Sequence, residues 1–238
     1  LRKHYIFKII PMLNPDGVVN GNYRCSLAGC DLNRRWKQPH KKLHPTIYNT
    51  KRLIKQLHQE RGVVLYCDLH GHSRKQNVFS YGCNNKNRPE ECRLFPLILS
   101  KLNGIFHFPS CRFGVQKSKE STARVALYKE LKSCPNIFTI ESTFAGIDIG
   151  EFAGQHMTTD HFESIGRDLC RTLLIYENLY IPPELRDIYG DREEGQTVTQ
   201  MMTNEILGNK RLINAGDGDS SGGSDSEPSE DNLPVEEV

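Results

Sequence analysis

Residues 62–72 read GVVLYCDLHGH, an apolar run that ends in alternating polar side chains. The run over residues 63–69 has the length and composition of a buried strand. Because successive side chains of a strand point to opposite faces, Asp68, His70 and His72 should share one face. His70 follows a buried strand, at the position where α/β sheets bind ligands. This pattern predicts a metal ligand, with a hydrogen-bonded structural histidine as the alternative.

Further strands and helices alternate along the chain on both sides of this stretch. Composition predicts strands over residues 5–13, 62–69, 77–81 and 136–144. Apolar spacing predicts helices over residues 46–61, 88–102 and 159–179, the last with a capping box from Asp160 to Glu163. Strands that alternate with helices indicate an α/β domain.

The composition is that of a soluble chain with one sizeable core, since 25% of the 238 residues are charged and 37% are hydrophobic. No uncharged apolar run is long enough for a membrane span, and no signal peptide is expected. The eight cysteines form no C-x-x-C pair, which favours reduced thiols in the cytosol. We expect a domain over residues 1–181, a peripheral extension over 182–214 and a disordered acidic tail over 215–238.

The charge is distributed unevenly along the chain. Eight of the 29 acidic residues follow Ala215, where there is no Lys or Arg, so residues 1–214 hold 31 basic and 21 acidic residues. A basic body predicts an acidic partner, which can be a nucleic acid, an anionic lipid or a protein rich in Asp and Glu. A solvated basic surface without a special partner is the alternative.

Several other polar residues occupy positions that suit catalysis or binding. Asn14-Pro-Asp-Gly17 has the composition of a turn. Arg24 and the Asn33-Arg34 pair lie in loops, from which arginines can bind a carboxylate, although surface arginines are the common case.

Glu141 lies inside an otherwise apolar strand. There it either pairs with a base or has its pKa raised by burial, as a general base requires, and exposure on an edge strand is the alternative. Arg124 opens a short helical stretch and by itself predicts nothing.

Taken in order, these motifs resemble those of the zinc metallocarboxypeptidases, specifically the cytosolic branch that removes glutamates from tubulin. The motifs are Asn14-Pro-Asp-Gly17, Arg24, Asp31-Leu-Asn-Arg34, Asp68-Leu-His-Gly-His72, Thr122-Ala-Arg124 and Ile140-Glu-Ser-Thr-Phe144. The loop over residues 22–29 is most similar to the cytosolic carboxypeptidase 2 and 3 subgroup. The resemblance covers about residues 5–180, and it implies a three-layer α/β/α fold with a mixed sheet, incomplete at its N-terminus.

The resemblance also implies roles for single residues in catalysis. His70 matches the third ligand of one zinc ion, and Glu141 matches the general base that activates the metal-bound water. Arg24 matches the residue that stabilises the developing oxyanion.

Further residues match the family's substrate-binding positions. Asn33 and Arg34 match the pair that holds the terminal carboxylate, and Arg124 matches the pocket for the departing side chain, where a positive charge selects Glu or Asp. The implied partners are glutamate-rich tails such as those of tubulin, with no nucleic acid and no membrane. The implied location is the cytosol, with association with microtubules, centrioles or cilia.

The zinc-binding motif of the family pattern is absent. The family takes its first two zinc ligands from an H-x-x-E motif, and none of the nine histidines is followed by Glu three residues later. We therefore expect a fragment that lacks this N-terminal part, holds zinc poorly and hydrolyses nothing alone. The alternatives are a catalytically inactive domain that binds acidic tails through Arg24, Arg34 and Arg124, and a basic nucleic-acid binder, which the lack of a recognised motif disfavours.

Overall fold

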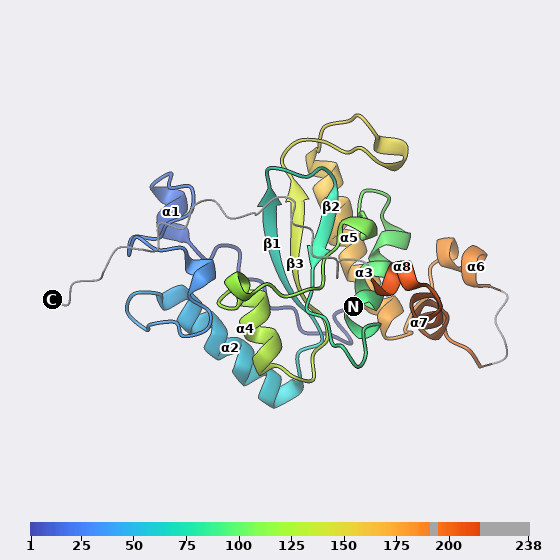
Figure 1. Ribbon diagram of the computed structural model, residues 1–238, viewed down its shortest axis with the longest axis horizontal. Helices are drawn as coiled ribbons and strands as arrows, with labels where there is room; N and C mark the ends of the chain where they lie inside the picture. The colour runs from blue at the N-terminus through green and yellow to red at the C-terminus, as the bar shows by residue number, and fades with distance from the viewer. Residues whose placement is uncertain (191–194, 215–238) are drawn as a thin grey trace.

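A three-stranded mixed sheet forms the centre of the protein (Figure 1). The computed structural model describes residues 1–190 and 195–214, so the predicted acidic tail over 215–238 lies outside the described residues. The strands are β1 (Tyr66–His72), β2 (Val78–Tyr81) and β3 (Ile137–Thr143), in the order β1-β3-β2. β1 runs parallel to β3 and β2 runs antiparallel to it, so the carboxyl ends of β1 and β3 meet at one edge.

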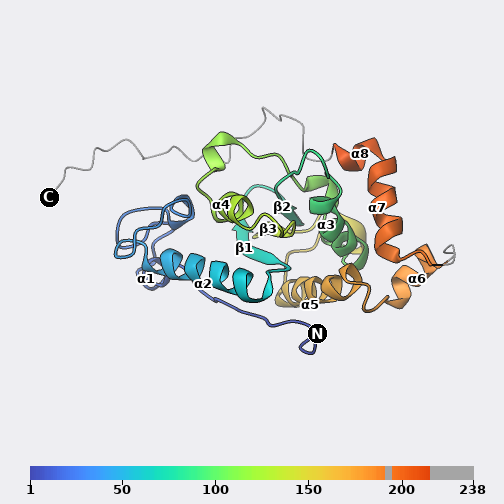
Figure 2. The same cartoon turned by 90° about the horizontal axis from the view of Figure 1, so that it is seen from below.

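Helices cover both faces of this sheet (Figures 1 and 2). The four main helices are α2 (Pro45–Arg61), α3 (Glu91–Leu102), α4 (Ala123–Glu130) and α5 (Thr159–Tyr176). Ile137 of β3 joins a buried cluster with residues of α2 and α4, whereas Phe138 and Ile140 join the larger cluster with α3 and α5. Alternate residues of one strand therefore serve two cores, and the predicted three-layer α/β/α fold is confirmed.

Shorter helices lie between and after these elements. In the described part of the chain they are α1 (Pro15–Val19), α6 (Pro183–Tyr189), α7 (Val198–Gly208) and α8 (Lys210–Ile213), with the 3₁₀ helices η1 (Leu32–Arg34), η2 (Phe108–Ser110), η3 (Lys117–Lys119) and η4 (Gly150–Phe152). Across residues 1–190 and 195–214, no helix combines the length and the apolar composition that crossing a membrane requires.

Sequence reasoning missed the helices α6, α7 and α8. Leu185, Met202 and Ile206 from this region are fully buried in the same cluster as residues of α3 and α5. The hydroxyl of Tyr189 also donates a 2.6 Å hydrogen bond to Glu205. The apolar residues are too sparse in the sequence for a clear helical period, and only their packing against α3 and α5 reveals the pattern.

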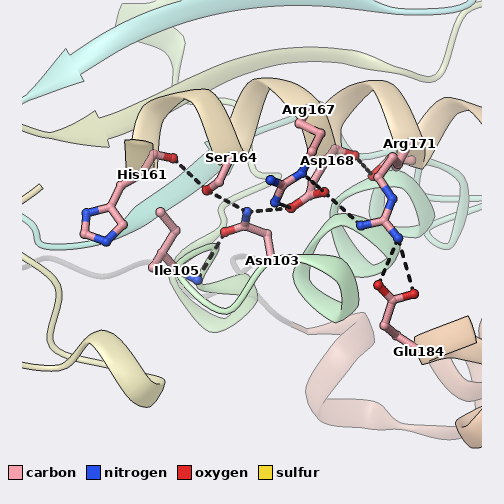
Figure 3. Close-up of polar contacts among 9 residues, drawn as sticks. Asn103, Ile105, His161, Ser164, Arg167, Asp168, Arg171 and Glu184 are labelled. Atoms are coloured by element: carbon pink, nitrogen blue, oxygen red, sulfur yellow. Dashed lines mark hydrogen bonds and ion pairs between the residues drawn. The ribbon is translucent and has the colours of Figure 1, made fainter. Parts of the chain in front are cut away.

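A buried carboxylate joins α5 to α3 and α6 (Figure 3). Asp168 is 1% exposed and accepts a 2.8 Å hydrogen bond from Asn103, which follows α3. Arg167 and Arg171 donate to the same carboxylate at 3.2 and 3.1 Å, and Arg171 also binds Glu184 of α6 at 3.0 Å. The free-energy cost of burying the Asp168 carboxylate is offset because its oxygens accept hydrogen bonds from both guanidinium groups and from an amide.

Three local predictions were wrong. Residues 5–13 form no strand, because no described strand lies beside them to accept their backbone hydrogen bonds, and their apolar side chains are mostly exposed. The strand predicted over residues 62–69 begins at Tyr66 and continues to His72. The capping box of α5 is formed by Thr158 and His161 and not by Asp160 and Glu163.

Candidate functional site

The carboxyl ends of β1 and β3 bring His70 and Glu141 together. The two residues are direct partners in the parallel register, so the chain places the predicted metal ligand and the predicted base on neighbouring strands. The carboxylate of Asp68 lies 3.0 Å from Nε2 of His70, as expected for residues on one face of a strand. A histidine whose Nε2 donates to a carboxylate keeps Nδ1 available for a metal, with its ring orientation fixed.

The charges around His70 change its pKa. Burial, the largest influence, lowers the pKa, but the hydrogen bond and charge of Asp68 and the charge of Glu141 outweigh it, so that the pKa of His70 is raised. The positive charge of Arg24 acts in the opposite direction. Three of the predicted catalytic residues are therefore close enough to interact electrostatically.

The Asn14-Pro-Asp-Gly17 motif positions the loop that carries Arg24. Asn14 caps α1, since its side chain accepts from the backbone N–H of Gly17 at 3.1 Å, so the motif starts a short helix where a turn was expected. The amide of Asn14 also donates to the carbonyl oxygens of Arg24 and Cys25 at 3.1 and 3.3 Å. A Cβ atom at Gly17 would lie 2.9 Å from the Cys25 oxygen, so only glycine permits this approach.

Asp31 connects three of the predicted site residues. Its Oδ2 lies 2.6 Å from Nε of Arg24 and 3.8 Å from a guanidinium nitrogen of Arg34. Its Oδ1 accepts a 2.8 Å hydrogen bond from the backbone N–H of Asn33 and thereby caps η1. The sequence placed Asp31 in the motif but assigned it no role, because its contact with Arg24 depends on how the loop folds back.

Asn33 links this loop to α4. Its side-chain oxygen accepts a 3.0 Å hydrogen bond from the backbone N–H of Ala123, the first residue of α4. Arg124 is the next residue of that helix, so the position of η1 and the position of Arg124 are coupled. The carbonyl of Ser121 also accepts a 3.1 Å hydrogen bond from the backbone N–H of Trp36.

Arg124 is buried, with 7% of its surface exposed, and is not a surface arginine. Its guanidinium donates to the carbonyl oxygen of Gly82 and to the sulfur of Cys83, and it lies 5.8 Å from the ring centre of Tyr81. Within the described residues it has no ion pair with a carboxylate. A buried cation held by neutral groups alone favours an anionic ligand.

Asn77 is a second residue that sequence reasoning missed. It has a left-handed backbone, with φ of 65°, and is 3% exposed. Its side chain donates to the carboxylate of Asp148 at 2.5 Å and accepts from the backbone N–H of Asp148 at 3.0 Å. Its own backbone carbonyl accepts from Thr143, so Asn77 fixes the loop that follows β3. An Asn before a strand is the only signal for this role in the sequence.

The described residues alone do not make a zinc site. His70 is their single predicted ligand, and no group of three His, Cys, Asp or Glu side chains within residues 1–190 and 195–214 is placed to hold a metal ion. A catalytic zinc site uses three protein ligands, so further ligands would have to come from outside the described residues.

Comparison with known proteins gives one consistent result. Residues 1–104 match the zinc carboxypeptidase family. The chain is 50% identical over 183 residues to cytosolic carboxypeptidase 3 from Mus musculus and 51% identical over 180 residues to cytosolic carboxypeptidase 2 from Xenopus tropicalis. Each match covers 74% of this chain and 18% of the relative, so the chain spans less than a fifth of the relatives' length.

The fold agrees with this result. It is similar to the crystal structure of a metallo-carboxypeptidase from Burkholderia cenocepacia, with a TM-score of 0.59 and 19% sequence identity. The likeness covers 72% of this chain and 44% of that chain.

Proposed function

Because this chain belongs to the zinc carboxypeptidase family, with half of its aligned residues identical to those of cytosolic carboxypeptidases, we propose that it forms part of a carboxypeptidase that removes glutamates from acidic protein tails. Glutamylated tubulin tails are the substrate class we assign to it. The name of the relatives supports a cytosolic location for this protein as well.

The buried charge of Arg124 is the observation that carries this proposal. Its guanidinium is bonded to the Gly82 carbonyl and has no carboxylate partner within the described residues. A glutamate side chain in this place would accept two charge-assisted hydrogen bonds, whereas an aliphatic side chain would leave the cation without a counter-charge. Selection of an acidic residue follows from this difference.

Recognition of a chain end is assigned to Asn33 and Arg34. The oxygen of the Asn33 side chain is occupied by the Ala123 N–H, which leaves its NH₂ group as a donor for a terminal carboxylate. Arg34 is held near Asp31 at 3.8 Å, a distance that leaves most of its donors available. A carboxylate bound by both residues would restrict the enzyme to the ends of chains.

Glu141 and Arg24 are assigned the chemical roles. Glu141 lies beside His70 across the β1–β3 pair, where it would take a proton from the attacking water. Arg24 has a side chain that is 44% exposed and is bonded through Nε to Asp31. Its guanidinium is assigned to donate to the developing oxyanion. The family implies a zinc ion, and among the described residues His70 is the one that would ligate it.

The proposal is tested with the full-length protein that contains this chain. A peptide with a C-terminal run of glutamates is incubated with the protein, with and without a zinc chelator, and the products are analysed by mass spectrometry. Stepwise loss of glutamates that the chelator stops is the expected result. Binding of the peptide without hydrolysis, unaffected by the chelator, would instead identify an inactive domain that binds acidic tails.

A further inference from the structure

The exposed side of α2 carries a groove of about 420 Å³. It is lined by Tyr48, Lys51, Arg52, Lys55, Gln56 and Gln59, together with Pro39 from the preceding loop. These helix positions recur three or four residues apart and therefore lie on one face of α2. None of them belongs to the candidate site described above.

The groove lies in the most basic part of the chain. Residues 37–61 contain a single acidic residue, Glu60, and seven basic residues, which are Lys37, Lys41, Lys42, Lys51, Arg52, Lys55 and Arg61. Such an excess on one helix and its preceding loop creates a local positive potential that attracts anions.

The fold uses only part of this charge. Lys51 is 8% exposed, and its Nζ donates to the carbonyl oxygens of Trp36 and Lys37 and pairs with Glu130 of α4 at 2.7 Å. Lys55 pairs with the other oxygen of Glu130 at 3.4 Å, yet half of its side chain is exposed. Arg52 is exposed and has no acidic partner within the described residues.

We propose that this groove binds an extended, glutamate-rich peptide segment. Three residues of a helix, the spacing of Arg52 and Lys55, rise about 4.5 Å, and two residues of an extended chain rise about 6.6 Å, a difference that long Arg and Lys side chains can span. Alternate glutamates of an extended peptide laid along α2 therefore meet successive side chains of its exposed face. Arg52 and Lys55 pair with the carboxylates, and the amides of Gln56 and Gln59 bind the peptide backbone.

The same residues fit a nucleic acid less well. A nucleic-acid surface neutralises a row of about six to ten phosphates with lysines and arginines. In this groove Glu130 forms ion pairs with Lys51 and Lys55 and neutralises part of their charge. Too little positive charge is then left to neutralise a phosphate backbone. Glutamine amides and a single tyrosine suit a short peptide instead.

The groove is connected through the chain to the candidate site. η1 holds Asn33 and Arg34, and the loop that follows it is fixed to α2 by the bonds from Lys51 to Trp36 and Lys37. The inference rests on the proposed function only for the class of ligand, since a glutamate-rich tail engaged at the groove need not present its chain end to Arg34.

Fluorescence anisotropy with a labelled oligoglutamate peptide tests the inference on the chain itself. The peptide carries a C-terminal amide, so that it lacks the carboxylate that the Asn33–Arg34 pair would hold. At low salt the double variant Arg52→Glu/Lys55→Glu should weaken binding about tenfold or more, because both cations are replaced by anions. The individual substitutions should each show part of this loss if the double variant is poorly folded.

The matched control is Lys210→Glu/Arg211→Glu on α8, which changes the net charge equally at the far end of the molecule from α2 (Figure 2). We expect it to bind as the wild type does. Equal loss in both double variants would show non-specific attraction and overturn the inference, as would unchanged binding by the α2 variant. Tighter binding of an oligothymidylate than of the peptide, lost in the same α2 variant, would assign the groove to nucleic acid.

A second peptide with a free C-terminal carboxylate separates this inference from the proposed function. If Arg34→Ala weakens binding of the free-acid peptide only, while the α2 variant weakens binding of the two peptides alike, the groove and the proposed function are both supported. Binding of the free acid that needs Arg34 but not Arg52 would retain the proposed function and reject the groove. If binding of both peptides requires Arg52 but not Arg34, the groove is supported and the assignment of Arg34 to the terminal carboxylate is rejected.

Discussion

Asp31 holds Arg24 by a 2.6 Å hydrogen bond from Nε, so that the loop carrying the proposed oxyanion-stabilising residue is tied to the start of η1. The same carboxylate lies 3.8 Å from Arg34 and bonds the backbone of Asn33. One acidic residue thus orients three residues to which substrate contacts are assigned.

Removal of the Asp31 charge should loosen this arrangement without unfolding it. Asp31→Asn keeps an acceptor for the Asn33 N–H, so the melting temperature should stay close to that of the wild type while affinity for a free-acid peptide falls about fivefold or more. Asp31→Ala should lose the same affinity and also about 1 kcal/mol of stability through the lost cap. Calorimetric titration and thermal unfolding measure the two effects. Unchanged affinity in both variants would show that Asp31 only caps η1.

Glu141→Gln tests the assignment of the base in the full-length protein. The amide keeps the shape of the side chain but cannot accept the proton, so kcat should fall by about two orders of magnitude or more with little change in peptide binding. Steady-state kinetics and binding of an uncleaved analogue measure these quantities. A decrease of less than about tenfold in kcat would remove Glu141 from this role.

Zinc binding by the chain alone should be weak, since His70 is its only predicted ligand and structural or catalytic sites need more. Metal analysis after stripping and reconstitution should find well below one zinc per chain. His70→Ala is the control and should change this small amount little. One zinc per chain in the wild type would contradict the prediction.

Asp168 should make stability depend on pH. Burial raises the pKa of this carboxyl, but hydrogen bonds from Arg167, Asn103 and Arg171 outweigh burial, and the pKa is lowered. A carboxyl whose folded-state pKa is lowered stabilises the protein above its unfolded-state pKa, and this contribution is lost as the pH falls.

Asp168→Asn should therefore reduce the free energy of unfolding by about 1–3 kcal/mol at neutral pH, and the deficit should shrink below about pH 4. Urea unfolding at both pH values measures it. Ser164→Ala on the same helix removes a weaker contact with Asn103 and should show no such pH dependence. A deficit for Asp168→Asn that is constant with pH would mean that the charge of Asp168 contributes nothing.

The elements that sequence reasoning located are those whose signal is local. The strands β1 and β3 were found because a β-branched run followed by polar residues is visible within a few positions. This placed Glu141 correctly inside a strand, whereas His70 was expected just after a strand that in fact continues to His72. The helices α2, α3 and α5 were found from apolar spacing. Residues 5–13 have an equally apolar sequence, but a strand also needs a neighbour, and no described strand pairs with them.

The features that escaped prediction depend on contacts between distant segments. The burial of Arg124 results from the approach of α4 to the Gly82 carbonyl, 42 positions away in the sequence, and no pattern around Arg124 indicates it. Asp31 and Asn77 gain their roles only when a loop folds back onto them. The helices α6 to α8 are sparse in apolar residues, and their buried side chains are defined by the core they join.

The proposed selection of glutamate depends most directly on the charge of Arg124. In the full-length protein, Arg124→Met should remove the partner of an acidic side chain while it keeps most of the buried volume. The catalytic efficiency kcat/KM for a peptide that ends in glutamate should fall by about two orders of magnitude or more. The value for the same peptide ending in leucine should stay level or rise. Arg34→Ala, which removes a contact common to both peptides, should lower both values equally.

The ratio of kcat/KM for the glutamate peptide to that for the leucine peptide, compared between the wild type and Arg124→Met, is therefore the deciding measurement. We expect a large preference for glutamate in the wild type and its loss or reversal in the variant. Equal losses on both peptides, or no loss on either, would contradict the assignment of Arg124 to an acidic side-chain pocket.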